Sequence, residues 1–264
     1  MVSKFKKHDG ARLAVLDEIL AALPRQARAV KEVRTGPYLT AVWVGGEQPE
    51  SFPFATSCGL ASTLAQHEHG GKKPVRKLGA LETLTAQDLA EYIKSDSPLE
   101  ASIGMAALNA MLEVPAHCFA EKHALEIVFE RGRNGRVAVV GHFPFVNRLR
   151  DEVKEVYVLE LKEVPGDLPS SKAKEILPRC DVIVLTATVL MNGTYHEMLP
   201  LCFHAFTVMM GPSTPASPAL WDYGVDVLAG TTVIDPKACL RAVSQGAGYR
   251  DLTDVKKWTW IREG

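Results

Sequence analysis

The stretch Arg136-Val137-Ala138-Val139-Val140-Gly141-His142-Phe143-Pro144 decides the fold expected for this chain. Its apolar run is β-branched and does not alternate with polar residues, as in a strand that is buried on both faces. Pro144 suits the first turn of a helix because its missing N–H is not needed there. In open α/β sheets, ligands bind at the carboxyl ends of the strands. The stretch therefore predicts an α/β fold with His142 beside a ligand crevice.

Four more apolar runs follow at the spacing of repeated strand–helix units. They are predicted to form strands over 155–160, 181–186, 206–210 and 225–229. Helices are predicted between these strands, over 144–152, 170–177 and 192–203. A last helix begins with Asp235 as the N-cap and Pro236 at the first position, and continues to residue 244. Five parallel strands with covering helices satisfy the right-handed crossover rule.

The first third of the chain has a different pattern. Helices are expected over 11–23, 85–94 and 97–112, and the last of these has many small residues and a capping-box arrangement of Ser97 and Glu100. Two strands, 30–34 and 39–44, flank a Gly-Pro turn and predict an antiparallel hairpin. Residues 52–64 fit a strand or a helix. We therefore expect two domains, 1–115 and 116–264, that meet near 114–122.

Composition limits the class of protein. The chain has 264 residues, of which 47% are hydrophobic and 23% charged, so it is long enough for two cores. Thirty Lys and Arg balance 31 Asp and Glu, and no basic stripe predicts a nucleic-acid partner. No segment reaches the ~18 apolar residues of a membrane span, so we expect a cytoplasmic protein with no membrane partner. Five scattered cysteines without a Cys-x-x-Cys pair suggest reduced thiols.

Several loop motifs resemble one known family. They are Gly141-His142-Phe143-Pro144, Gly166-Asp167-Leu168-Pro169, Asn192-Gly193-Thr194, Gly211-Pro212-Ser213-Thr214-Pro215, and Asp222-Tyr223-Gly224-Val225-Asp226 with Gly230-Thr231. With them, the whole chain resembles the putative heavy-metal chelation family, most strongly over 136–246. The resemblance implies a small α+β domain like the N-terminal domain of enolase, followed by a Rossmann-like domain. It also implies an active site between them and a role in making or processing metal-chelating small molecules.

His142 and Glu160 are the candidate catalytic residues. Histidine can serve as acid or base near neutral pH because its ordinary pKa is ~6.5, although His142 could equally be a loop residue that bonds a backbone carbonyl. Glu160 lies 19 positions after Gly141, where an acidic residue can meet ribose hydroxyls, or could simply be an exposed carboxylate at a strand end. Because bulky residues follow Gly141, a dinucleotide cradle is disfavoured, whereas an adenosyl pocket stays open.

The remaining candidates are expected to contact a ligand. Gly211, Ser213 and Thr214 form the best candidate for an anion-binding loop, although the same loop could be only a rigid structural turn. Asn192 and Thr194 could bind ligand or cap a helix, Asp235 is more typical of an N-cap, and Asn109 is a polar residue on the small-residue helix that needs a partner. Three more, Gly141, Phe143 and Gly230, border strand ends at the expected crevice.

Direct metal binding has weak support in the sequence. His67-Glu68-His69 with Cys58 matches no standard zinc spacing, so no metal ligand is assigned and the cofactor is left unknown. Motifs of acyl hydrolases, nucleotide triphosphatases and zincins are absent from the sequence. We therefore expect an enzyme that condenses or hydrolyses a pterin-like or siderophore-like chelator. The alternatives are a non-catalytic protein that binds a metal or metal chelate, and a methyltransferase-like protein. The sequence leaves a homo-oligomer open.

Overall fold

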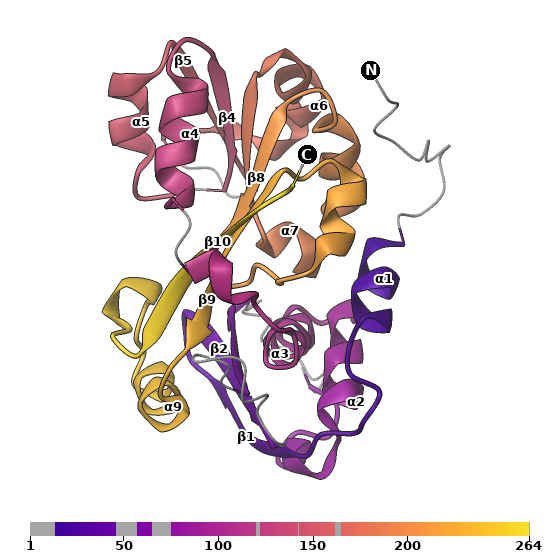
Figure 1. Ribbon diagram of the computed structural model, residues 1–264. Helices are drawn as coiled ribbons and strands as arrows, with labels where there is room; N and C mark the ends of the chain where they lie inside the picture. Colours follow the sequence, from indigo (N-terminus) through magenta and orange to yellow (C-terminus); the bar gives the residue numbers. More distant parts are fainter. Residues whose placement is uncertain are drawn as a thin grey trace.

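The protein is an α/β protein with two sheets, a small antiparallel one and a larger, mostly parallel one (Figure 1). The computed structural model describes residues 14–45, 57–64, 75–119, 122–141, 143–161 and 165–263. His142, His67 and His69 lie outside these described residues. In Figure 1 the large sheet and its helices occupy the upper part of the molecule, and the small sheet with α2, α3 and α9 occupies the lower part.

The large sheet has the strand order β10-β9-β8-β7-β4-β5-β6. The strands are β4 (Arg136–Val140), β5 (Glu155–Glu160), β6 (Leu168–Pro169), β7 (Val182–Thr186), β8 (Phe206–Met210), β9 (Val227–Val233) and β10 (Val255–Ile261). All neighbouring pairs are parallel except β9 and β10. The five parallel strands expected from the apolar runs are thus confirmed, and β6 and β10 are additions that the sequence reading missed.

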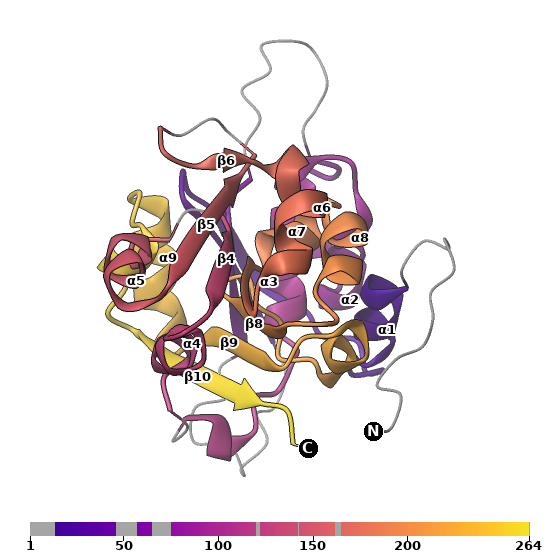
Figure 2. The ribbon, with the colours of Figure 1, turned by 90° about the horizontal axis from the view of Figure 1, so that it is seen from above.

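Both faces of this sheet are covered, which explains why its apolar runs do not alternate. Val137 and Val139 of β4 pack with α4 (Ala124–Gly132) and α5 (Val146–Glu152). Ala138 and Val140 belong to the core on the opposite face. That face is covered by α6 (Ala173–Ile176), α7 (Thr188–Met191) and α8 (Tyr195–Met198), as the view from above makes plain (Figure 2). Buried positions therefore follow one another along each strand.

Gly230 lies inside a strand, which corrects the expectation that it borders a loop. The antiparallel partner β10 prolongs β9 to Val233 and places Trp258 opposite Gly230. A Cβ at Gly230 would lie 2.3 Å from the Trp258 ring, so the indole fills the space that a side chain would need. The sequence reading ended this strand at residue 229 because it considered each apolar run alone, without the edge strand that pairs with it.

The small sheet has the order β1-β2-β3 and is antiparallel throughout. Its strands are β1 (Val30–Thr35), β2 (Leu39–Val44) and β3 (Cys58–Ser62). The expected hairpin is confirmed as β1 and β2, and the part of 52–64 that the structure describes includes a strand. α3 (Pro98–Asn109) packs on this sheet, and α9 (Pro236–Ser244) packs on β1 and β2. The C-terminal half of the chain therefore contributes a helix to the N-terminal sheet.

The remaining helices are α1 (Val15–Ala21) and α2 (Ala86–Ala90). Thr85 caps α2 in a capping box with Asp88, and Asp235 caps α9 as expected by accepting the N–H groups of Lys237 and Ala238. The capping box expected at α3 is only half formed. Ser97 accepts the Glu100 N–H, but the Glu100 carboxylate bonds Arg76 and Ser95 instead of returning to Ser97. A tertiary ion pair has replaced the local contact.

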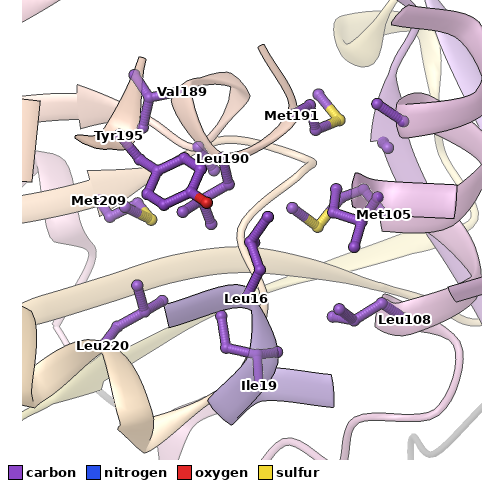
Figure 3. Close-up of a cluster of buried hydrophobic side chains, with 14 of the residues drawn as sticks. Leu16, Ile19, Met105, Leu108, Val189, Leu190, Met191, Tyr195, Met209 and Leu220 are labelled. Atoms are coloured by element: carbon purple, nitrogen blue, oxygen red, sulfur yellow. The ribbon is translucent and has the colours of Figure 1, made fainter. Parts of the chain in front are cut away.

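The largest hydrophobic core joins the two sheets and their helices (Figure 3). Leu16 and Ile19 of α1 meet Met105 and Leu108 of α3 beside side chains of α7, α8 and β8. The helices that the structure describes include none long and apolar enough to cross a membrane. The N-terminal and C-terminal halves therefore share buried apolar surface, and the cleft between them is set by this packing.

Candidate functional site

The strand order creates a crevice between β4 and β7. After β4 the chain continues to β5 on one side, and after β7 it continues to β8 on the other side. The chain therefore leaves the ends of the neighbouring strands β4 and β7 in opposite directions. Ligands of open α/β sheets bind at such a switch point, outside the carboxyl ends of the strands. Here those ends are Gly141, which follows β4, and Thr186, which ends β7.

A cavity of about 300 Å³ lies at this point and is lined from both halves of the chain. Ser62, at the end of β3, is the contribution of the small sheet. The large sheet and its loops add apolar residues such as Val140 and Leu159, together with several polar ones. These polar lining residues are Glu160, Ser170, Thr186, Thr188, Asn192 and Thr194. An apolar floor with a few convergent polar groups is typical of a small-molecule site.

Gly141 brings the backbone of the crevice close to β7. Its φ of +99° lies in the left-handed region, and a Cβ there would lie 2.9 Å from Thr186 Cγ2. Its N–H donates to the Leu159 carbonyl at 2.9 Å. Only glycine meets both demands, since a side chain would be strained and would clash. Phe143 also lines the cavity and stacks on Phe145 with a centroid separation of 5.2 Å.

The hydroxyl and amide groups of the lining are held by one another. Thr186 Oγ1 and Thr188 Oγ1 lie 3.0 Å apart. Asn192 Oδ1 accepts the Thr194 N–H at 3.0 Å and the Thr194 hydroxyl at 2.7 Å. The Thr194 side chain makes no capping bond to α8, which was one of the two roles that the sequence left open, and its hydroxyl bonds Asn192 instead. These hydrogen bonds fix the positions of the side chains that line the cavity.

Glu160 stands at the carboxyl end of β5 and lines the same cavity as Gly141. Its Oε2 accepts the N–H of the following residue, Leu161, at 3.0 Å. The sequence spacing between Gly141 and Glu160 thus corresponds to the ends of two neighbouring strands, β4 and β5.

The loop after β8 has a more structural role than its sequence suggested. Gly211, with a φ of +123°, and Pro212 line the cavity. Ser213 and Thr214 are only 1% and 2% exposed, and neither belongs to that lining. The Ser213 hydroxyl accepts the Ser62 N–H at 2.8 Å, and Thr214 Oγ1 has no hydrogen-bond partner among the described residues. Ser213 therefore joins the loop to β3 and sets the width of the crevice.

Asn109 and Asp235 lie away from this lining. The Asn109 amide donates to the Leu60 carbonyl of β3 at 2.9 Å, and its Oδ1 is buried without a partner among the described residues. Asp235 Oδ1 accepts the first N–H groups of α9. Asn109 therefore joins α3 to β3, and Asp235 caps the start of its own helix, α9. The assignment of both residues as ligand contacts stays a prediction.

Comparisons with known proteins agree with this architecture. Two family models, both described as putative heavy-metal chelation, match residues 16–112 and 123–259. The chain belongs to the putative heavy-metal chelation family. A search of the curated proteins finds no match.

Two solved structures of proteins of unknown function from the DUF364 family share the fold of this family member. The one from Desulfitobacterium hafniense DCB-2 is 24% identical, with a TM-score of 0.76 over 97% of this chain and 100% of that one. The one from Pyrococcus horikoshii is 20% identical, with a TM-score of 0.74 over 94% of this chain and 98% of that one.

This family member has a second, larger cavity of about 820 Å³ that adjoins the first through Leu161 and Asn192. Asp17, Lys94 and Asp96 line it from the N-terminal side, and His196 lines it from the other side. Lys94 Nζ bonds Asp17 at 2.6 Å and Glu91 at 3.1 Å, and the bond to Asp17 is the main cause of a raised Lys94 pKa. The sequence offered no signal for these residues, which look like ordinary polar positions of surface helices.

No cluster of three or more His, Cys, Asp or Glu suited to a metal ion occurs within the described parts of this family member. Cys58, which the sequence reading considered together with His67 and His69, lies in the apolar layer between β3 and α9. The two histidines fall outside the described residues. The described residues therefore do not support that candidate metal site. A link to metal comes from the family description alone.

Proposed function

We propose that this family member is an enzyme of small-molecule metabolism whose substrate binds between its enolase-N-terminal-like and Rossmann-like halves. The observation that carries the proposal is the cavity at the end of β4, where a carboxylate, an amide and several hydroxyls converge on an apolar floor. Pre-positioned polar groups of this kind orient a substrate, and pockets of about 300–1,000 Å³ are typical of such sites. The family description supports a substrate that chelates metal, of the pterin or siderophore kind.

The proposed reaction is condensation or hydrolysis of an oxygen-rich and nitrogen-rich chelator. Glu160 would orient the substrate or a catalytic proton, and His142, the residue after Gly141, would transfer that proton. Threonine hydroxyls such as Thr186 and Thr188 would donate to substrate oxygens, a role first expected of Ser213 and Thr214. The rival proposal is a binding protein that captures a metal chelate in the same cleft without turnover. The position of Glu160 also supports an adenosyl ligand.

A matched pair of substitutions on β5 tests the site. Glu160 and Glu155 stand at opposite ends of that strand, and only Glu160 lines the cavity. Purified variants Glu160→Gln and Glu155→Gln are mixed with pterins, with catecholate and hydroxamate chelators with and without Fe³⁺, and with S-adenosylmethionine. Melting temperature and mass-spectrometric product formation are recorded. We expect Glu160→Gln to lower kcat/KM at least ~10-fold, about 1.4 kcal/mol of transition-state stabilisation, and Glu155→Gln to behave as wild type.

The outcomes separate the proposals. A melting-temperature shift without product would support the binding protein, and a shift with S-adenosylmethionine alone would support the adenosyl ligand. Equal activity of wild type and Glu160→Gln would show that the Glu160 carboxylate has no role in the reaction.

A chelator test separates metal held by the protein from metal held by its small molecule. If chelation belongs to the small molecule, the protein folds without metal, and EDTA should leave its melting temperature unchanged within error. The measurement is a thermal melt before and after EDTA, with metal analysis of the dialysed protein. One equivalent of zinc that survives dialysis in wild type, and is lost in the His67→Ala/His69→Ala variant, would contradict this expectation because a structural metal stabilises the fold that binds it.

A further inference from the structure

The larger cavity and the smaller one are two compartments of one cleft. Leu161 and Asn192 line both of them. The end of β3 runs along both, because Ser62 lines the smaller cavity and the next residue, Thr63, lines the larger one. The loop after α7 does the same, since Thr194 lines the smaller cavity and both of its neighbours line the larger one. A ligand in the smaller compartment can therefore extend directly into the larger one.

The wall that both compartments share at the end of β3 is held by two hydrogen bonds. The Ser62 N–H donates to the Ser213 hydroxyl at 2.8 Å, and the Leu64 N–H donates to the Ser102 hydroxyl of α3 at 2.8 Å. Because β3 is an edge strand of the small sheet, these side chains satisfy N–H groups that would otherwise need a further strand. One side of the passage between the compartments is therefore fixed by the fold.

The two compartments differ in their chemistry. The smaller one presents a carboxylate, an amide and several hydroxyls. The larger one has apolar lining residues, most of them buried, which include Leu16, Leu64, Ile93, Leu161, Leu190 and Met191. Its charged lining residues, Asp17, Lys94 and Asp96, are all exposed. The larger compartment therefore has an apolar floor and a charged rim that faces water.

Leu161 stands where the two compartments meet. It is 61% exposed, and it is one of four large apolar side chains that are exposed among the described residues. The other three line neither cavity. Contact with an apolar part of a ligand would remove the leucine side chain from water, which is favourable. The Leu161 N–H donates to the Glu160 carboxylate at 3.0 Å, so this apolar contact is adjacent to a candidate catalytic group.

The volumes of the compartments distinguish compact ligands from extended ones. The smaller compartment, of about 300 Å³, lies at the lower end of the range of about 300–1,000 Å³ that is typical of ligand pockets. The larger one, of about 820 Å³, has more than twice that volume. A compact ring system such as a pterin would leave the larger compartment empty. A ligand that fills the whole cleft therefore needs a second, apolar part.

We propose that the larger compartment binds an apolar arm of the substrate, an acyl or aryl chain attached to the polar, metal-chelating head that lies in the smaller compartment. Leu161 contacts this arm where it passes from one compartment to the other, and so determines specificity for it. The inference rests on the proposed function for the head and adds the arm to it. It favours a siderophore-like chelator with a chain over a pterin.

The test uses the full-length protein and a series of alkyl hydroxamates, from acetohydroxamate to octanohydroxamate. Every member of the series has the same chelating head, and only the length of the apolar chain changes. Dissociation constants are measured by isothermal titration calorimetry without added metal. We expect the affinity to rise by about 3-fold for each added methylene until the larger compartment is filled, because each buried methylene removes a similar apolar area from water.

Two exposed leucines provide a matched pair of variants. Leu161 is 61% exposed and lines both compartments, whereas Leu78 is 63% exposed and lines neither. Leu161→Asp should weaken the binding of octanohydroxamate at least ~10-fold and change that of acetohydroxamate less than ~2-fold, because only the long chain crosses this position. Leu78→Asp should bind both ligands as wild type does. Leu161→Ala, which adds no charge, should show a smaller loss in the same direction and replaces Leu161→Asp if that variant does not fold.

Glu160→Gln separates this inference from the proposed function. It should weaken every member of the series by the same factor, since the carboxylate contacts the head and not the chain. Affinity that depends on Glu160 but not on chain length would overturn the arm compartment and keep the site of the head. A chain-length dependence lost in Leu161→Asp, with no effect of Glu160→Gln, would support the arm and contradict the role of Glu160.

Two further outcomes would overturn the inference. A chain-length dependence that survives in both Leu161 variants would show that the chain binds elsewhere on the protein. Absence of binding by every hydroxamate of the series would contradict the arm compartment, and would also remove hydroxamates from the proposed substrates.

Discussion

Gly59→Ala should lower the free energy of unfolding by about 3 kcal/mol or more, and is expected to cause one of the largest losses of any single methyl addition in this protein. A Cβ at Gly59 would lie 2.1 Å from the Ala106 carbonyl oxygen and 2.3 Å from the Ala110 nitrogen. Both atoms belong to the backbone at the end of α3, which cannot rotate away as a side chain would. The methyl group must therefore push α3 off the small sheet.

The matched control is Gly45→Ala. The nearest atoms to a Cβ at Gly45 lie 3.5 Å away, which is ordinary contact, and its φ is outside the left-handed region. Urea unfolding of both variants measures the difference. We expect Gly45→Ala to stay within about 1 kcal/mol of wild type. Equal stability of the two variants would show that α3 can shift at little cost, and that the small-residue face of this helix is not what sets the packing.

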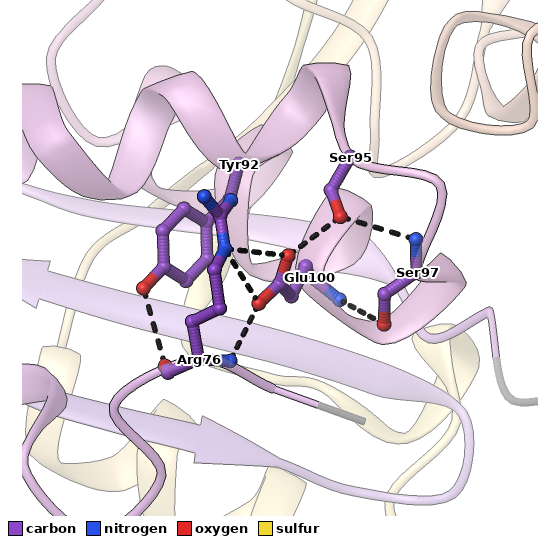
Figure 4. Close-up of polar contacts among 5 residues, drawn as sticks. All are labelled: Arg76, Tyr92, Ser95, Ser97 and Glu100. Carbon is purple, nitrogen blue, oxygen red and sulfur yellow. Dashed lines mark hydrogen bonds and ion pairs between the residues drawn. The ribbon is translucent and has the colours of Figure 1, made fainter. Parts of the chain in front are cut away.

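Glu100→Ala should destabilise the protein by roughly 3 kcal/mol at neutral pH, because it breaks a buried ion pair from the buried side. The Glu100 side chain is 4% exposed and that of Arg76 is 64% exposed. The carboxylate accepts the Arg76 backbone N–H at 2.5 Å, the Arg76 guanidinium at 3.0 Å and the Ser95 hydroxyl at 2.5 Å (Figure 4). Tyr92 completes the cluster, with the guanidinium 4.3 Å above its ring.

The same cluster predicts a pH dependence. Burial raises the pKa of Glu100, but the bonds from Arg76 and Ser95 outweigh it and hold the folded-state pKa below the ordinary value of 4.5. A lowered folded-state pKa gives stability that is present above the unfolded pKa and is lost as the pH falls through the folded one. Glu100→Gln cannot titrate at this position, so the stability difference between wild type and this variant should shrink below pH 4.5.

This pH dependence is checked by urea unfolding of wild type and Glu100→Gln, at neutral pH and at several values below pH 4.5. The exposed Glu82→Gln is the control, and it should differ little from wild type at any of these values. A difference for Glu100→Gln that stays constant with pH would mean that charge has no part in the stability of the cluster.

Local patterns in the sequence were sufficient to predict most strands of the large sheet. Runs such as 136–140 and 206–210 became strands at the expected residues, because a strand buried on both faces must be apolar at successive positions. Asp235 and Pro236 began α9 as predicted, since an N-cap depends on neighbours only two or three residues away. These signals are local, so they can be read without knowing what the element packs against.

Long-range partners were decided by the tertiary structure. β10 carries Lys256 and Lys257 and gives no clear apolar run, and it becomes a strand by pairing with the edge of β9, where Gly230 receives Trp258. Glu100 left its local cap for Arg76, since a buried carboxylate is stabilised more by a cation than by one more N–H group.

The candidate site, too, was predicted in part from the sequence and decided in part by the tertiary structure. The sequence by itself placed Gly141, Glu160 and Asn192 near strand ends, and the strand order then brought them to one cavity. It could not show that Ser62 forms the opposite wall or that Ser213 is a buried link to it. The contact between these two residues joins positions 151 apart in the sequence. Hydrophobic periodicity specifies which face of an element is buried, but only the packed fold specifies which other element covers that face.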